Sequence, residues 1–200
     1  MNNISLDNFL KLNNCNIWEG NIGSCIAKQQ LLNSIASRAN TFLEIGFNAG
    51  HSANIILGAN PNLKLVSFDL GSHDYVLKGK EYIDKMYPNR HTLILGDSKD
   101  TLTQYVNENK GRVFDALFID GGHEYEIAKS DMLNCLKLAH EKSIIIMDDT
   151  IYISGWERHY SVGPTSMWKE ACDTGLIRDD IRLTIDYNNG ISYGYKGQTA

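Results

Sequence analysis

Short runs of β-branched and apolar residues alternate along this chain with longer stretches of helical period. This alternation constrains the fold more than any other feature, because it predicts a parallel sheet covered by helices on both faces. The last of the five predicted parallel strands is apolar throughout, as a strand covered on both faces should be. The five runs are Thr41–Ile45, Lys64–Phe68, His91–Leu95, Asp115–Ile119 and Ser143–Met147.

The remaining periodic stretches predict helices and a closing hairpin. Helices are expected to open at Ser52–Leu57 and to span Ile22–Arg38, Glu124–Ala139 and Thr165–Thr174. Two final strands, Arg182–Tyr187 and Ile191–Tyr195, flank the turn signal Asn188-Asn189-Gly190. The right-handed crossover rule leaves few topologies for this order. The prediction is a doubly wound, mostly parallel α/β sheet of seven strands with a C-terminal antiparallel hairpin.

Length and charge narrow the class of protein. The 200 residues suit one domain, and the net charge of −5 gives no basic surface for a nucleic acid. The polar start lacks the layout of a signal peptide, and no apolar run approaches the length that spans a bilayer. The four cysteines form no closely spaced pair, so a structural zinc site is not expected. A cytoplasmic protein that binds no membrane is predicted.

Acidic residues stand at the ends of all five predicted parallel strands. In open α/β sheets, ligands bind outside the carboxyl ends of the strands. One aspartate at such a place often caps a helix, but capping does not account easily for five positions in one chain. The acids are Glu44, Asp69, Asp97, Asp120 and the pair Asp148 and Asp149.

The turn after the first strand carries the most specific signal. Its sequence, F-L-E-I-G-F-N-A-G-H-S over residues 42–52, places Gly46 and Gly50 where the chain passes from strand to helix. Glycines there let backbone approach a ligand and let the helix start close to it. A dinucleotide site prefers G-x-G-x-x-G, and Asn48 stands at the middle position, so an NAD-linked oxidoreductase is disfavoured. Asp69 is placed to bind both hydroxyls of a ribose.

Three motifs in this order resemble the class I S-adenosylmethionine-dependent methyltransferases. The turn after the first strand looks like the first motif of the catechol-type O-methyltransferases. F-D-A-L-F-I-D-G-G-H-E-Y-E and S-I-I-I-M-D-D-T look like the motifs at the fourth and fifth strands of that group and of its sugar- and macrolide-modifying relatives. The resemblance covers about residues 20–150. It implies the Rossmann-like methyltransferase fold and the cofactor S-adenosyl-L-methionine.

Within that fold, the resemblance divides the chain of residues 1–200 into three parts of one domain. Residues 1–40 form an N-terminal helical segment, 41–150 the cofactor-binding core, and 151–200 an acceptor lid, a helix and the closing hairpin. The turn would hold the methionine end of the cofactor, Asp69 its ribose, and Asp97 with Ser98 its adenine. The full predicted cofactor set is Glu44, Gly46, Phe47, Asn48, Gly50, Ser52, Asp69, Asp97, Ser98 and Asp120.

The resemblance also implies a divalent metal. Asp120, Asp148 and Asp149 stand where the relatives place Mg²⁺ ligands, and carboxylate oxygens suit Mg²⁺ or Mn²⁺. The alternative is that Asp149 caps the following segment and only two acids converge. An acid at position 149, where catechol-type relatives often have an amide, favours a sugar or glycoside as acceptor over a catechol.

His123 is predicted to act with Asp120 in catalysis, as the general base. It follows Asp120 by three residues, where catechol-type enzymes carry a lysine, and histidine removes protons well near neutral pH. The alternative is a histidine that caps the following helix. His51 and His159 are rivals for the role, and His159 lies in a polar stretch, 154–163, long enough to form a lid over the acceptor.

Aromatic residues of the C-terminal part allow two interpretations. Tyr152, Trp156 and Tyr160 are placed either to stack on an acceptor ring or to pack at the surface, while Trp18 and Trp168 are expected in the core or an interface. The leading prediction is a metal-assisted O-methyltransferase of a small hydroxylated acceptor, acting as a possible homo-oligomer or as part of a larger multidomain enzyme. The alternatives are a catechol-type enzyme and a cofactor-binding domain without chemistry.

Overall fold

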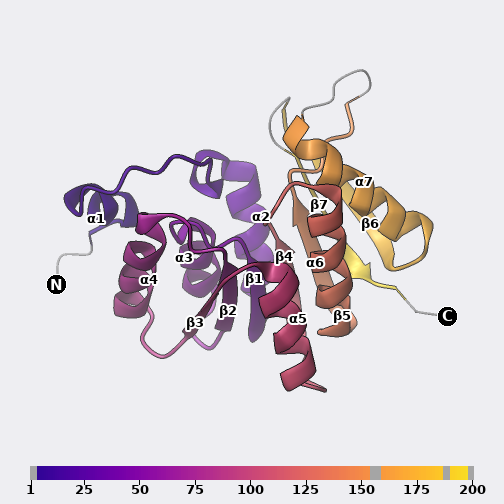
Figure 1. Ribbon diagram of the computed structural model, residues 1–200, viewed down its shortest axis with the longest axis horizontal. Helices are drawn as coiled ribbons and strands as arrows, with labels where there is room; N and C mark the ends of the chain where they lie inside the picture. Colours follow the sequence, from indigo (N-terminus) through magenta and orange to yellow (C-terminus); the bar gives the residue numbers. More distant parts are fainter. Residues whose placement is uncertain (1–3, 154–158, 187–189, 198–200) are drawn as a thin grey trace.

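The computed structural model describes residues 4–153, 159–186 and 190–197. Within these residues seven strands form one sheet in the order β3-β2-β1-β4-β5-β7-β6 (Figure 1). The strands are β1 (Thr41–Ile45), β2 (Lys64–Asp69), β3 (His91–Leu95), β4 (Phe114–Ile119), β5 (Ala139–Asp148), β6 (Ile177–Thr184) and β7 (Gly190–Lys196). The first five pair in parallel, and β7 lies antiparallel between β5 and β6. The predicted fold class is confirmed.

Helices cover both faces of the sheet. Neighbouring residues of a strand point to opposite faces, so Phe42 packs with α1 to α4 while Leu43 packs with α5 to α7. Figure 1 shows α5 and α6 side by side along the second face. The helices are α1 (Leu6–Leu12), α2 (Ile26–Ala36), α3 (His51–Ala59), α4 (Asp74–Met86), α5 (Ser98–Glu108), α6 (Tyr125–Lys137) and α7 (His159–Asp173). None of the helices in the described ranges is long and apolar enough to cross a bilayer.

The N-terminal helix differs from its prediction. The stretch 22–38 is not one helix but a 3₁₀ turn, Ile22–Ser24, followed by α2. Cys25 has an extended backbone between them, and the side chain of Asn21 accepts a hydrogen bond from the N–H of Gly23 at 2.9 Å. The 3₁₀ turn therefore ends at Ser24, and Cys25 separates it from α2.

The C-terminal elements start earlier than predicted. Helix α7 begins at His159 and continues through Pro164, the residue before the predicted start at Thr165. Strand β6 begins at Ile177, which pairs with Lys196 of β7; the register then shifts between Arg178 and Ile181, and Asp179 has φ 54°. Asp179 and Asp180 lie within this irregularity, which has the character of a β-bulge. The turn residues Asn188 and Asn189, like Trp156, lie outside the described residues.

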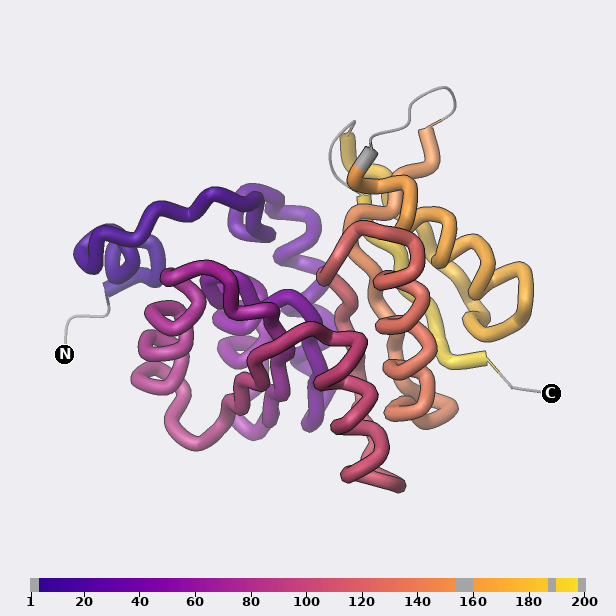
Figure 2. Tube along the Cα trace, in the orientation of Figure 1, coloured from indigo at the N-terminus to yellow at the C-terminus, as the bar shows by residue number. Residues whose placement is uncertain are grey.

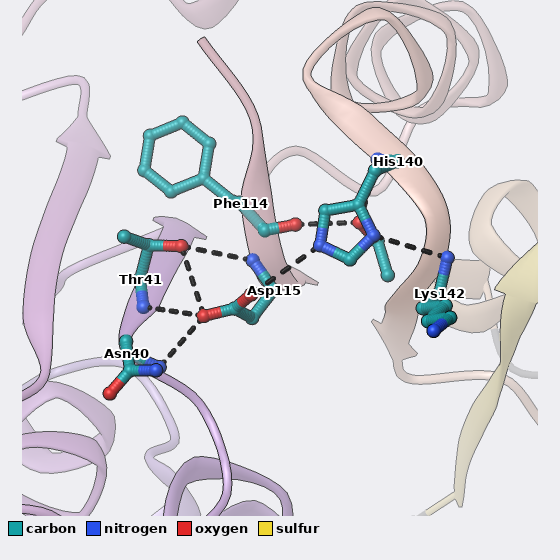
Figure 3. A network of polar contacts seen from close by, with 7 residues as sticks. Asn40, Thr41, Phe114, Asp115, His140 and Lys142 are labelled. Atoms are coloured by element: carbon teal, nitrogen blue, oxygen red, sulfur yellow. Dashed lines mark hydrogen bonds and ion pairs between the residues drawn. The ribbon is translucent and has the colours of Figure 1, made fainter.

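The amino ends of β1, β4 and β5 are fixed by a polar network around Asp115 (Figure 3). One carboxylate oxygen accepts hydrogen bonds from the backbone N–H groups of Asn40 and Thr41 at 2.7 and 2.9 Å, and the other lies 3.4 Å from Nε2 of His140. Burial disfavours the charged carboxylate, but these hydrogen bonds outweigh it and lower the pKa of Asp115. The network closes one edge of the sheet, which leaves the carboxyl edge for ligands.

Candidate active site

A cavity of about 860 Å³ lies at the carboxyl edge of the sheet, at the point where the strand order reverses between β1 and β4. Its size suits one cofactor and a small acceptor. The residues that follow β1 to β5 contribute to its walls, and the segment 19–25 covers it. Figure 2 shows this connection running from α1 across that edge to α2. Glu19 joins it to the first turn, because its carboxylate lies 3.3 Å from Nδ2 of Asn48.

The turn after β1 brings three strand ends together. The N–H of Gly46 donates to the carbonyl of Phe68 at 2.8 Å, and the N–H of Asp120 donates to the carbonyl of Ile45 at 2.9 Å. Gly46 has φ 92°, and a Cβ there would lie 1.9 Å from the carbonyl oxygen of Asp120. Both the conformation and the contact require glycine. The turn therefore exposes backbone to the cavity where a ligand can approach it.

The structure divides the predicted cofactor residues into two groups. Those that line the cavity are Gly46, Asn48, Asp69, Asp97, Ser98 and Asp120. The other four, Glu44, Phe47, Gly50 and Ser52, are buried and lie outside the lining. These four support the turn from behind: the ring of Phe47 stacks on His91 with centroids 5.0 Å apart, and Gly50 precedes the first residue of α3 with φ 90°.

Asp69 is held rigidly at the end of β2. Its Oδ2 accepts a hydrogen bond from the N–H of Asn48 at 2.7 Å, and its Oδ1 accepts one from the N–H of Gly71 at 2.8 Å. An ionised carboxylate has about four acceptor sites, so both oxygens can still accept bonds from a ligand. Asp97 caps α5 by accepting from the N–H of Lys99 at 2.9 Å and also lines the cavity.

Glu44 belongs to a buried network beneath the turn. The parallel register places it beside Ser67, whose hydroxyl donates to Oε2 of Glu44 at 2.6 Å. Nε2 of His91 lies 2.9 Å from the same hydroxyl oxygen. Burial raises the pKa of Glu44 to about 7 and lowers the pKa of His91 to about 4. Both groups are therefore adapted to a neutral form inside the protein.

The substitution Glu44→Gln is expected to raise the stability of the protein relative to wild type, and to do so more at pH 8 than at pH 5. With its pKa near 7 in the folded state and near 4.5 when unfolded, Glu44 stabilises the fold fully below pH 4.5 and loses that contribution as the pH rises through 7. The variant avoids burying the charge, an effect on the order of 3 kcal/mol. Melting temperatures of both proteins at pH 5 and 8 measure it. Exposed Glu141→Gln serves as the control, and a difference from wild type that stays constant with pH would contradict the expectation.

Three carboxylates, a lysine and a histidine meet at the ends of β4 and β5. Nζ of Lys28 lies 2.5 Å from Asp148 and 3.4 Å from Asp149, and Nε2 of His123 lies 3.0 Å from the other oxygen of Asp149. Asp149 has φ 54°, an uncommon conformation that turns its side chain back toward this cluster. Burial, followed by the charges of Asp148 and Asp149, raises the pKa of Asp120 well above its usual range.

The contacts of His123 bear on the alternative that this histidine caps the following helix. The backbone residue that caps α6 is Glu124, and no side chain caps that helix end, so His123 is the partner of Asp149 and not a helix cap. The hydrogen bond that the ring of His123 donates to the carboxylate of Asp149 raises the pKa of His123 despite its partial burial. A carboxylate that orients a histidine in this way is the usual partner of a general base. The ring of Tyr160, which also lines the cavity, lies 5.6 Å from that of His123.

Of the two rival histidines, only His51 has a described side chain, and it lies outside the cavity. His51 pairs with Asp7 at 2.9 Å and is outside the cavity lining, and the side chain of His159 lies outside the described residues. Tyr152 packs under the guanidinium of Arg182, 4.6 Å from its ring centroid, and is outside the lining. Trp168 is buried as expected, whereas Trp18 is 79% exposed and is not a core residue of this chain.

The cluster contains one potential ligand group for a metal. Donor atoms of Asp120, His123 and Asp149 all lie within 4.8 Å of one another. Asp148, which the sequence places in the ligand set, is instead engaged by Lys28. Sequence reasoning missed Lys28, although a signal was present: it shares one helical face with Leu32 and Ile35, and a lysine on an apolar face needs a buried counter-charge.

Comparison with known proteins finds methyltransferases both by sequence family and by structure. A family model described as a methyltransferase domain matches residues 43–150. The structure is similar to that of an O-methyltransferase from Bacillus cereus in complex with SAH, with a TM-score of 0.73, 18% identity, and coverage of 96% of this chain and 90% of the other. It is also similar to TomG from Streptomyces achromogenes, an O-methyltransferase involved in tomaymycin synthesis, in complex with SAM: TM-score 0.75, 14% identity, coverage 96% and 88%. No curated protein matches the chain in sequence.

Proposed function

Because this chain belongs to the methyltransferase domain family, we propose that it is an S-adenosylmethionine-dependent O-methyltransferase. Its acceptor is a small hydroxylated molecule, a sugar or glycoside in preference to a catechol. The observation that carries the proposal is one cavity in which the cofactor turn at Gly46 and the carboxylate of Asp69 adjoin the pair of His123 and Asp149. The similar O-methyltransferases with bound SAH or SAM support the same cofactor.

The residues of the cavity suit the two halves of this reaction. The backbone at Gly46 and Asn48 would hold the methionine end of the cofactor, Asp69 the ribose hydroxyls, and Asp97 with Ser98 the adenine. The bound cofactor would supply an electrophilic methyl group on its sulfonium sulfur, and S-adenosylhomocysteine would leave as the bond between sulfur and methyl breaks. His123 accepts the proton of the acceptor hydroxyl as the oxygen attacks that methyl group, and Asp149 stabilises the imidazolium that forms. Holding both reactants in line provides most of the acceleration.

Polar groups at the acceptor end support a sugar. Asn21, Ser24, Lys28 and Asp149 all line the cavity and offer donors and acceptors for several hydroxyls. A catechol would present two hydroxyls and a flat apolar ring. A cofactor-binding domain without chemistry, the alternative of another class, would not need an oriented pair of histidine and aspartate inside the cavity.

Assistance by Mg²⁺ or Mn²⁺ forms the second part of the proposal. Asp120, His123 and Asp149 are the residues that would hold the ion, and two hard carboxylate oxygens with an imidazole suit Mn²⁺ and tolerate Mg²⁺. A bound ion would lower the pKa of the acceptor hydroxyl. A ring nitrogen that ligates a metal cannot also accept a proton, so the two roles of His123 compete wherever they need the same nitrogen.

A methyl-transfer assay across panels of sugars, glycosides and catechols, each with and without chelator, tests both parts. We expect methylation of sugars or glycosides that is lost in chelator and restored by Mg²⁺ or Mn²⁺. Methylation of catechols alone would overturn the choice of acceptor, and a full rate in excess chelator would remove the metal. Cofactor binding without transfer to any acceptor would favour the domain without chemistry.

Asp69→Ala is expected to weaken the binding of S-adenosylmethionine at least about tenfold, because the ribose loses charge-assisted hydrogen bonds. Isothermal titration calorimetry measures the affinity directly. Asp100→Ala is the matched control, since Asp100 is an exposed aspartate in the first turn of α5 that does not line the cavity. Equal affinities for Asp69→Ala and wild type would exclude the ribose role of Asp69.

A further inference from the structure

Lys28 is a buried cation in the acceptor part of the cavity. Its side chain is only 5% exposed, and it reaches from α2 to residues 120 and 121 positions later in the chain. It lies outside the part of the sequence that the family model matches, residues 43–150. The position is therefore supplied by the N-terminal segment and not by the matched core.

The contacts of Asp148 explain what the ammonium group does there. Oδ1 of Asp148 accepts a hydrogen bond from the backbone N–H of Asp149 at 2.9 Å and also binds Nζ of Lys28 at 2.5 Å. A carboxylate so engaged offers a poor ligand to a second cation, because the two positive charges would repel each other at close range. Asp149 contacts Lys28 more loosely, at 3.4 Å, and its other oxygen faces His123.

We propose that Lys28 is a resident cation of the acceptor site: its ammonium group holds Asp148 in the place where a divalent metal would otherwise bind it. Only Asp120, His123 and Asp149 then remain available as ligands. The inference deepens the proposed function, on which it rests, by limiting the metal capacity of the site. The ion pair also couples the position of α2 to the catalytic cluster, because the positive charge that neutralises Asp148 is carried by a residue of that helix.

The test compares metal binding with and without the ammonium group. Wild type, Lys28→Met and the double variant Lys28→Met/Asp148→Asn are stripped with chelator and then titrated with Mn²⁺ while the melting temperature is recorded. Lys28→Met frees Asp148, so we expect it to bind Mn²⁺ about tenfold more tightly than wild type does. At one Mn²⁺ concentration, roughly 100 times the dissociation constant of the variant, the melting temperature of Lys28→Met should then rise by about 3–5 °C more than that of wild type. The double variant removes the freed ligand and should respond as wild type does.

Lys169→Met is the matched control, since Lys169 forms an exposed ion pair with Asp173 on α7, and it should also respond as wild type. Equal responses of Lys28→Met and wild type would overturn the inference. If Lys28→Met does not fold in chelator, recovery of its circular dichroism on refolding with Mn²⁺ supports the inference, and failure to recover overturns it. Titration of wild type with S-adenosylhomocysteine distinguishes failure of the proposed function from failure of the inference about Lys28. Absence of binding would refute the proposed function, while the comparison of Mn²⁺ responses would still test the role of Lys28.

Discussion

Gly46→Ala is expected to lower the free energy of unfolding by about 4 kcal/mol or more, an effect large enough to leave much of the protein unfolded. The new Cβ would lie 1.9 Å from the carbonyl oxygen and 2.8 Å from the carbonyl carbon of Asp120. That backbone is fixed, because the N–H of Asp120 is hydrogen-bonded to β1. The strand ends of β1 and β4 must separate to admit the methyl group, and the cofactor turn is lost with them.

Gly111→Ala is a control that separates the steric clash of a Cβ at position 46 with Asp120 from the strain of a positive φ. Gly111 has φ 84°, close to the 92° of Gly46, but nothing lies within 4 Å of a Cβ built on it. Its substitution should cost only about 1 kcal/mol, the strain of a left-handed alanine. Urea unfolding of the two variants gives both free energies. Similar losses would show that strain, and not the contact with Asp120, makes Gly46 necessary.

His123→Ala is expected to lower kcat by about 10²–10⁴ while the affinity for S-adenosylmethionine stays nearly unchanged. The side chain is 44% exposed and pairs with Asp149, whereas the carboxylate of Asp69 is hydrogen-bonded to the backbone of Asn48 and Gly71. Its removal should therefore affect the chemical step more than the fold. Single-turnover rates, calorimetric affinities and melting temperatures on the same preparation measure the three quantities.

The chain offers a matched control for His123 at the opposite edge of the sheet. His140 also pairs with an aspartate, Asp115, and its side chain is 36% exposed. His140→Ala should keep the full rate and lose only a little stability. A His123→Ala enzyme that retains its rate but melts lower would show a structural histidine, and Tyr160, which shares the cavity wall, would be the next residue to test.

Most of the fold could be predicted because its signals are local. The apolar runs identified all five parallel strands within a few residues, and the hairpin at the end of the chain was placed correctly in the sheet. Errors arose where local signals conflicted with tertiary pairing. Strand β6 begins at Ile177, five residues before the predicted Arg182, and continues past a register shift at Asp179 and Asp180; the extended backbone of Cys25 interrupts a helix that the periodicity alone makes continuous.

The candidate site was predicted unevenly for the same reason. The sequence places an acid at each strand end, and the strand ends of a parallel sheet share one edge, so Asp69, Asp97 and Asp120 could be expected at the cavity. By its position near a strand end, Glu44 cannot be distinguished in the sequence from these three aspartates. It is buried because it lies within β1, one residue before the strand ends, where it faces Ser67 on the neighbouring strand.

The sequence by itself determined the order of strands and helices along the chain, the edge of the sheet at which the cavity lies and the family, because each of these depends on patterns within a short stretch of chain. The tertiary structure alone decided which charges neutralise one another. Lys28 and Asp148 are 120 positions apart, and only the path of α2 beside the carboxyl edge brings the ammonium group within 2.5 Å of the carboxylate. Electrostatic attraction depends on distance in space and on burial, and neither quantity is encoded in the spacing of residues along a chain.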